Sequence, residues 1–174
     1  MKHKLLFAGL ITLSLCACNH QPNREALVSE IESADSAFVS HANRMASNTE
    51  DASHMMELYT QFADLFPEDS LAPIYLRKAG DIAAHTANED QAVELYNRVI
   101  EQYGDYPELS EVYFSKAWTL EQGQRYAEAK EAFLLFVDQY PDHPLAKDIR
   151  FMLEQNLIGL SVEEQYEAIV GNAN

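Results

Sequence analysis

The chain contains almost no cysteine. Of its 174 residues only Cys16 and Cys18 are cysteines, so the chain after residue 18 offers no disulfide and no thiolate ligand for a metal. Its six histidines are scattered, and no two of them have the i, i+4 spacing around an acid that zinc proteases need. A glycine-rich phosphate loop is also missing. We therefore expect no catalytic residue, no metal site and no cofactor, and we do not expect an enzyme.

Basic residues are also scarce, with 12 lysines and arginines against 28 aspartates and glutamates. The resulting formal charge of −16 disfavours nucleic acid and anionic lipid headgroups as partners, because both are negatively charged. Helix faces that contact solvent need charged side chains, and this ordinary requirement accounts for most of the acid excess. We expect no nucleic-acid partner.

The first 17 residues have the pattern of an export signal. A short basic start is followed by an apolar run from Leu5 to Ala17, which is too short for a membrane span of about 20 residues. The run ends in Leu15-Cys16-Ala17-Cys18, which resembles the bacterial lipobox, where a cysteine is lipidated and becomes the mature N-terminus. Cys18 fits this role better than Cys16, because the bulky Leu15 directly precedes Cys16. A plain secretory signal with a disulfide between the two cysteines is the alternative.

Lipidation at Cys18 implies a permanently tethered protein, since two or more acyl chains make membrane attachment stable. Asn19 follows the cysteine in place of the aspartate that retains lipoproteins in the inner membrane of enterobacteria. The resemblance therefore implies the outer membrane of the cell envelope, with the protein facing the periplasm. Residues 18–24 then form the lipidated cysteine and a short polar tether.

Along the rest of the chain, hydrophobic residues recur at three- and four-residue spacing, which predicts helices and no strand. We expect seven long helices and a short one. Asn88 with Gln91 and Ser161 with Glu164 are capping pairs that support two of the helix starts. The expected organisation is an N-terminal helix pair that is a degenerate repeat, then repeats with capping helices, then a tail: residues 25–66, 67–170 and 171–174.

Two sets of aromatic residues recur at an interval of 37 residues. An ordinary helical bundle is the alternative to a repeat, but a bundle needs no fixed period. In the first helices, Tyr75 and Ala79 match Tyr113 and Ala117 at an interval of 38, so we expect one-residue changes in the loops to compensate. The two aromatic sets are Tyr59, Tyr96 and Phe133, and Phe66, Tyr103 and Tyr140.

Residues 113–141 read YFSKAWTLEQGQRYAEAKEAFLLFVDQYP. Two amphipathic helices meet at Gly123 and Gln124, and the short side chains of Ala117 and Ala129 allow them to approach closely. This order of aromatic residues, alanines and a final proline resembles the tetratricopeptide repeat (TPR), a helix–turn–helix of about 34 residues. The resemblance implies an all-α fold, a TPR-like α-solenoid of about three helix hairpins plus a C-terminal capping helix pair that shields the apolar end of the stack.

In TPR proteins the first helix of each unit lines a concave groove that receives a peptide or a helix of a partner protein. Trp118, the only tryptophan, is the expected anchor of such a groove, because large aromatic residues dominate binding energies. The alternative is that Trp118 and Phe114 cover the neighbouring hairpin as core, and that Arg150 is a solvated arginine. The partner-binding residues that the resemblance implies are Leu76, Gly80, Phe114, Trp118, Glu121 and Arg150.

Residues 55–169 are similar to TPR lipoproteins of the bacterial envelope. The similarity is greatest to small ones of Bacteroidetes-type bacteria, and more distant to the β-barrel assembly lipoprotein and to the TPR domain of the Tol–Pal coordinator. It implies a non-enzymatic, lipid-anchored adaptor that binds a partner protein or peptide in the groove, in outer-membrane assembly or maintenance. A self-associating structural scaffold with no separate ligand is the first alternative, and a binder of small molecules or cell-wall fragments is the second.

Overall fold

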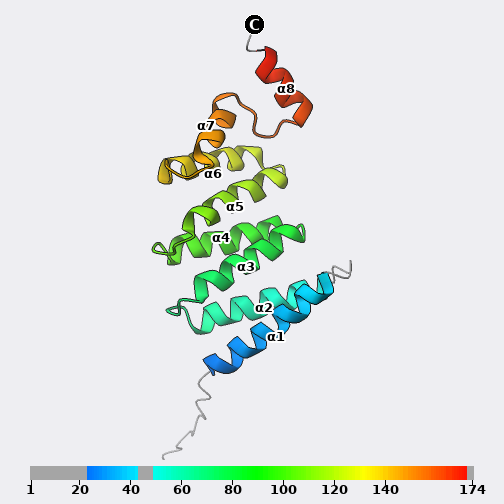
Figure 1. Ribbon diagram of the computed structural model, residues 1–174, viewed down its shortest axis with the longest axis vertical. Coiled ribbons are helices and arrows are strands. Elements are labelled where there is room, and N and C mark those ends of the chain that lie inside the picture. The colour runs from blue at the N-terminus through cyan, green and yellow to red at the C-terminus, as the bar shows by residue number, and fades with distance from the viewer. Residues whose placement is uncertain (1–22, 43–48, 172–174) are drawn as a thin grey trace, which may run out of the picture.

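The computed structural model describes residues 23–42 and 49–171, so Cys18 and the predicted export signal lie outside it. Within the described residues the only regular secondary structure is helical (Figure 1). None of these helices has both the length and the hydropathy that crossing a membrane requires. The helices are α1 (Arg24–Ala42), α2 (Thr49–Leu65), α3 (Ala72–His85), α4 (Glu89–Gln102), α5 (Leu109–Gln122), α6 (Tyr126–Gln139), α7 (Ala146–Glu154) and α8 (Val162–Gly171).

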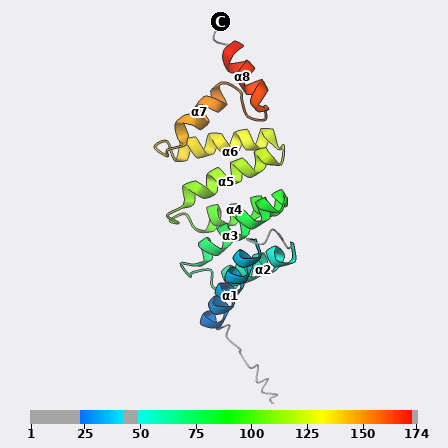
Figure 2. The ribbon, with the colours of Figure 1, turned by 45° about the vertical axis from the view of Figure 1, so that its right-hand side comes forward.

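Successive helices pack against each other from α1 to α7. α1 with α2, α3 with α4, and α5 with α6 form three hairpins, and α7 packs on α6 (Figures 1 and 2). The first helices of two neighbouring hairpins, α3 and α5, also contact each other. An inner helix of the stack thus packs against the helix before it and the helix after it, as a solenoid requires. The predicted all-α solenoid with three hairpins is confirmed.

The structural repeat is 37 residues long, and equivalent helix ends keep this interval from unit to unit. α3, α5 and α7 begin at residues 72, 109 and 146, and α2, α4 and α6 end at residues 65, 102 and 139. The loops between hairpins repeat their backbone hydrogen bonds as well. The N–H groups of Phe66, Tyr103 and Tyr140 each donate to the carbonyl four residues earlier, at 2.8, 2.9 and 2.9 Å.

This constant period corrects one predicted equivalence. Tyr75 occupies the position of Val112, not that of Tyr113, because every helix bound between the two units differs by 37 residues. The compensating one-residue changes in the loops are therefore absent between these units. Gly80 in α3 is then the equivalent of Ala117 in α5.

In the second and third hairpins, a small residue of the first helix lies against an aromatic residue of the second helix. A Cβ atom added to Gly80 would lie 2.7 Å from Cε1 of Tyr96, which is closer than carbon atoms approach. In the next unit, Ala117 and Phe133 are fully buried in one hydrophobic cluster together with Ala129. The predicted burial of Ala117 and Ala129 is confirmed, and it allows the two helices of a hairpin to approach closely.

The turns inside two hairpins contain a residue with left-handed backbone conformation. Ala87 has φ 56° and Gln124 has φ 60°. The next N–H groups, of Asn88 and Arg125, donate to the carbonyl five residues earlier at 3.0 and 2.9 Å. This geometry closes a helix C-terminus and reverses the chain direction. The turn predicted after α5 is confirmed.

One of the two predicted capping pairs is present. The Ser161 N–H donates to Oε2 of Glu164 at 2.8 Å, and the Glu164 N–H donates to Oγ of Ser161 at 3.3 Å, so this reciprocal cap of α8 is confirmed. The pair of Asn88 and Gln91 is wrong as a cap. The side-chain amide of Asn88 donates to Oε1 of Gln91 at 2.7 Å, so the two side chains bond to each other and not to the backbone.

The first helix is attached to the stack by ion pairs. Nε of Arg24 lies 2.5 Å from Oδ2 of Asp69, in the loop between α2 and α3. This contact with Arg24 holds the pKa of Asp69 below its ordinary value. Further along α1, Asp35 accepts hydrogen bonds from Tyr59 in α2 and, at 2.9 Å, from Lys78 in α3. The start of α1 is therefore connected to the loop between α2 and α3, and its middle is connected to α2 and α3.

The last two helices do not form the expected capping pair. α7 covers α6, but α8 packs against no other helix of the described part and buries none of its residues. Both views show α8 pointing away from the stack beyond α7 (Figures 1 and 2). The loop before α8 explains this direction, because Gly159 lies against the ring of Tyr126 and its N–H donates to Glu121 at 3.3 Å. α7 alone therefore covers this end of the stack.

We predict that Gly80→Ala destabilises the fold. The new methyl group would push against Tyr96, whose hydroxyl is fixed by a 2.8 Å hydrogen bond to Asp81. Overpacking costs about 1–3 kcal/mol, which exceeds the gain of about 1 kcal/mol in helix propensity. Urea unfolding should show a lower midpoint for Gly80→Ala and an unchanged midpoint for Gly104→Ala, where no atom lies within 4 Å of the added methyl group. A midpoint for Gly80→Ala at or above that of the original chain would contradict the predicted contact.

Candidate functional site

A small cleft lies on the face formed by the first helices of the second and third hairpins. It has a volume of about 190 Å³. Trp118 of α5 forms one side of it, and the C-terminal end of α3 forms another. We call it the Trp118 cleft, and its lining residues are Ala84, His85, Glu89, Trp118, Thr119 and Gln122.

Trp118 is exposed and rigidly supported. Its side chain is 46 % exposed, and its ring stacks on Phe114 with 6.3 Å between centroids and 18° between planes. Phe114 in turn contacts Phe133 and Phe136 of α6, with centroids 6.2 and 5.8 Å apart. One predicted alternative therefore holds for each residue: Phe114 packs against the core, whereas Trp118 offers an aromatic surface to solvent.

The rim of the Trp118 cleft is polar. Nδ1 of His85 lies 2.7 Å from the carbonyl oxygen of Asp81, so this nitrogen donates to the backbone and the ring is held in place. Glu89 contributes the one formal charge among the lining residues, a negative one. The cleft therefore suits an apolar side chain with neutral or basic neighbours better than one flanked by acids.

Two predicted groove residues of α3 lie in the core. Leu76 is fully buried, and Gly80 is covered by Tyr96. Neither offers surface to a partner, so their predicted contact role does not fit the structure. The 37-residue period gives the reason: the α3 positions that correspond to Phe114 and Trp118 are Arg77 and Asp81, one residue further along the helix.

Arg77 and Asp81 form a charged group on α3. A guanidinium nitrogen of Arg77 lies 3.2 Å from Glu108 and another lies 4.0 Å from Asp81. The hydroxyl of Tyr96 donates to Asp81 at 2.8 Å, while burial raises the pKa of this carboxyl group. These contacts connect α3 to Tyr96 of α4 and to Glu108 in the loop before α5, so they mainly stabilise the contact between the hairpins, while Nε of Arg77 is buried without a hydrogen-bond partner among the described residues.

Glu121 and Arg150 are engaged by the chain itself. Oε1 of Glu121 accepts the Gly159 N–H, and its Oε2 is buried without a hydrogen-bond partner among the described residues. Arg150 donates from a guanidinium nitrogen to the carbonyl oxygen of Val137 at 3.1 Å. Both side chains therefore attach the C-terminal segment to the third hairpin, and of the six predicted groove residues only Trp118 is both exposed and beside a cleft.

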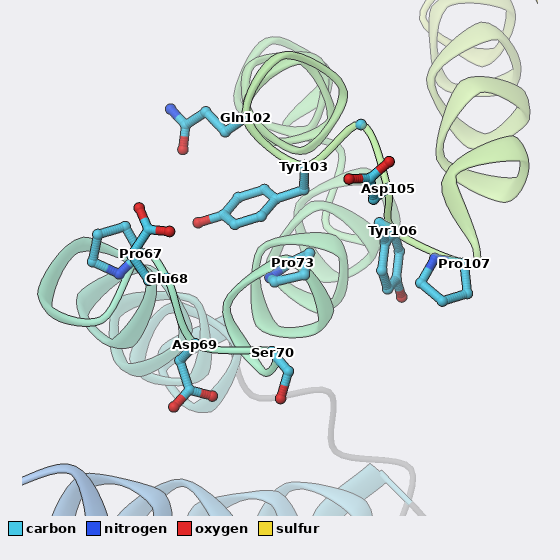
Figure 3. A pocket seen from close by; sticks show the side chains of 11 residues that line it. Pro67, Glu68, Asp69, Ser70, Pro73, Gln102, Tyr103, Asp105, Tyr106 and Pro107 are labelled. Carbon is cyan, nitrogen blue, oxygen red and sulfur yellow. The ribbon is translucent and has the colours of Figure 1, made fainter.

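A larger cavity, of about 650 Å³, lies between the loop from α2 to α3 and the loop from α4 to α5 (Figure 3). Tyr103 points into the space between these loops, toward Pro67 and Glu68. Its hydroxyl is buried with no hydrogen-bond partner in the described part of the chain, and this burial raises the pKa of Tyr103. The sequence patterns did not predict this cavity. Gly104 could have indicated it, because this glycine stands where the other units have proline and leaves that position of the loop without a side chain.

The larger cavity is lined mainly by prolines, tyrosines and carboxylates, together with Ser70, Gln102 and Gly104. Across residues 23–42 and 49–171, no group of three histidine, cysteine or acidic side chains is placed to hold a metal ion. The geometry indicates surfaces for binding.

Comparison with protein families supports this interpretation. The family model of the tetratricopeptide repeat matches residues 76–106 and 111–143, which lie in the second and third hairpins. These two segments therefore match the tetratricopeptide repeat, a module typical of protein–protein interaction. No curated protein and no solved structure matches the chain.

We predict that Glu121→Ala loosens the loop from α7 to α8. The substitution removes the acceptor of the Gly159 N–H, a bond worth about 1 kcal/mol. Hydrogen exchange of residues 157–161 should become roughly fivefold faster, while exchange in α3 and α4 stays the same. Glu131→Ala is the matched control, because Glu131 is an exposed acid on α6. Unchanged exchange in the loop of the Glu121→Ala chain would show that Glu121 does not hold it.

Proposed function

We propose that this chain is a non-enzymatic adaptor of the bacterial envelope that binds a partner protein at the Trp118 cleft. The carrying observation is that Trp118 is half exposed beside a cleft on the face of the first TPR helices. The volume of about 190 Å³ is below the roughly 300–1,000 Å³ of small-molecule sites, so it favours a side chain of a protein or peptide. The partner segment would place one apolar side chain into the cleft.

The energetics support Trp118 as the anchor. A tryptophan buries up to about 250 Å², so covering its exposed 46 % would remove about 100 Å² from water, worth about 2–3 kcal/mol. The stacking on Phe114 already fixes the ring, so little side-chain entropy is lost on binding. This combination of exposed aromatic surface and fixed geometry is typical of binding hot spots.

Lipidation at Cys18 would give this adaptor its location at the outer membrane, facing the periplasm. The support is the sequence pattern before Cys18 and the attachment of Arg24 to Asp69, which fixes the start of α1. Residues 19–23 would span at most roughly 18 Å when fully extended. The tether would keep the α1 end near the membrane and direct the other end of the stack away from it.

A self-associating scaffold is the second candidate function. The observation that favours it is the unpaired apolar side of α8. Such association and binding at the Trp118 cleft would use different surfaces of the chain, so the two functions are compatible.

We predict that Trp118→Ala weakens partner capture by roughly 30–100-fold, which corresponds to about 2–3 kcal/mol. The measurement is a pull-down from envelope extracts, quantified by titration of the captured protein. Leu65→Ala is the matched control, because Leu65 is a similarly exposed apolar residue, 41 %, on α2. Circular dichroism should be the same for both variants. Capture of the same protein at the same strength by the Trp118→Ala chain would exclude the cleft as the binding site.

We predict that Cys18→Ala abolishes lipidation and releases the chain from the membrane, whereas Cys16→Ala leaves both unchanged. The reason is the position of Cys18 after the small residue Ala17. Mass spectrometry of the N-terminal peptide from bacterial membranes measures the acyl groups directly. A lipid on Cys16, or an unmodified Cys18 in a secreted chain, would contradict the proposed anchor.

A further inference from the structure

α8 is an amphipathic helix with an uncovered apolar side. Val162, Tyr166 and Ile169 follow each other at i, i+4 and i+7, so they lie on one side of the helix. Tyr166 is 69 % exposed, and no residue of α8 is buried. A side of this kind on a soluble helix normally packs against another element.

The spacing on α8 equals the spacing with which α6 covers α5. Ala129, Phe133 and Phe136 also follow each other at i, i+4 and i+7, and all three are fully buried. Together they form the side of α6 that packs in the third hairpin. α8 therefore has the apolar pattern of the second helix of a hairpin.

α7 lacks the cover that such a second helix would provide. Phe151 of α7 occupies the repeat position of Phe114 in α5, 37 residues earlier. Phe114 is covered by Phe133 and Phe136 of α6. Phe151 has no equivalent cover and is 46 % exposed. α7 thus resembles the first helix of a hairpin without its cover, and α8 resembles the second helix of a hairpin without its partner.

The loop of the same chain holds these two helices apart. Seven residues, 155–161, separate α7 from α8, whereas three residues separate the helices of the second and third hairpins. Leu157 in this loop is buried, Gly159 is bound to Glu121, and the side chain of Asn156 accepts a hydrogen bond from Lys130. The anchored loop directs α8 away from α7, so α8 does not cover Phe151 of its own chain.

The charges favour packing of α8 against α7 over packing of α8 against a second α8. α8 carries Glu163, Glu164 and Glu167 and no basic residue. Two such helices side by side would repel each other, whereas α7 has no net charge, because Lys147 and Arg150 balance Asp148 and Glu154. A second copy of this chain therefore supplies a helix with an uncovered aromatic residue and without the repulsion that a second α8 would bring.

We propose that two copies of this chain associate by exchanging α8, so that α8 of each copy packs on Phe151 of the other. Each contact is repeated by two-fold symmetry, which closes the pair and limits it to two chains. The surface is separate from the Trp118 cleft, so this association does not depend on the proposed adaptor function. The interface is small, and exchange of single short helices places it among the weaker associations.

The direct test uses a photo-crosslinking amino acid at position 166 of the full chain. Equal amounts of light and heavy isotope-labelled chain are mixed and irradiated, and the crosslinked peptides are identified by mass spectrometry. The proposal predicts adducts between α8 and α7 in which about half join a light to a heavy chain. Adducts confined to one isotope would show that α8 packs on its own chain, and adducts between two α8 helices would show a different pairing. Either result would overturn the proposal.

Sedimentation equilibrium of the full chain with Cys18→Ala gives the second readout. We expect a concentration-dependent mass that approaches twice that of one chain, and Phe151→Ser or Tyr166→Ser should each weaken association by about tenfold or more. Lys147→Glu should weaken it too. Leu65→Ser is the matched control and should change nothing, because Leu65 lies on α2 with similar exposure. The mass of a single chain at all concentrations, or equal association of all variants, would contradict the exchange.

Discussion

The contact between a small residue in the first helix of a hairpin and an aromatic ring in the second is the constraint on which this structure depends. At Gly80 the ring of Tyr96 leaves no room for a methyl group, and in the next unit Ala117 and Phe133 occupy the same two positions. Short side chains at these positions let the helix axes approach to about 8–10 Å. The loops between hairpins have equal lengths and equivalent backbone hydrogen bonds, so they place successive hairpins at an interval of 37 residues and produce a stack.

The surface available for function follows from this packing. In α3 and α5, Gly80 and Ala117 are occupied by the hairpin contact, and the residue that follows each of them is turned toward solvent. In α5 that residue is Trp118, and in α3 it is Asp81, which is bound to Tyr96. The second and third hairpins thus differ in what they present, although their backbones are equivalent. Binding chemistry concentrates at α5, and the uncovered apolar surface concentrates at the C-terminal end.

The sequence predicted the hairpins well because their aromatic residues recur at a fixed interval. It was less successful for the groove. Matching Tyr75 with Tyr113 shifted the expected register by one residue. One residue rotates the expected direction of a side chain by about 100° around the helix axis, so Leu76 and Gly80 were expected on the surface. The direction of α8 was also missed. Its capping pair predicts a helix at that place, but its direction depends on Gly159, Tyr126 and Glu121, which come together only in the folded chain.

A double-mutant cycle between positions 80 and 96 tests the central claim most directly. It compares the cost in unfolding free energy of Gly80→Ala in the original chain with its cost in a Tyr96→Leu chain, where the ring is gone. If the ring is what requires glycine, the cost should fall to zero or become a gain, with a coupling energy of about 1 kcal/mol or more. An equal cost in both backgrounds would mean that the stack does not depend on this contact.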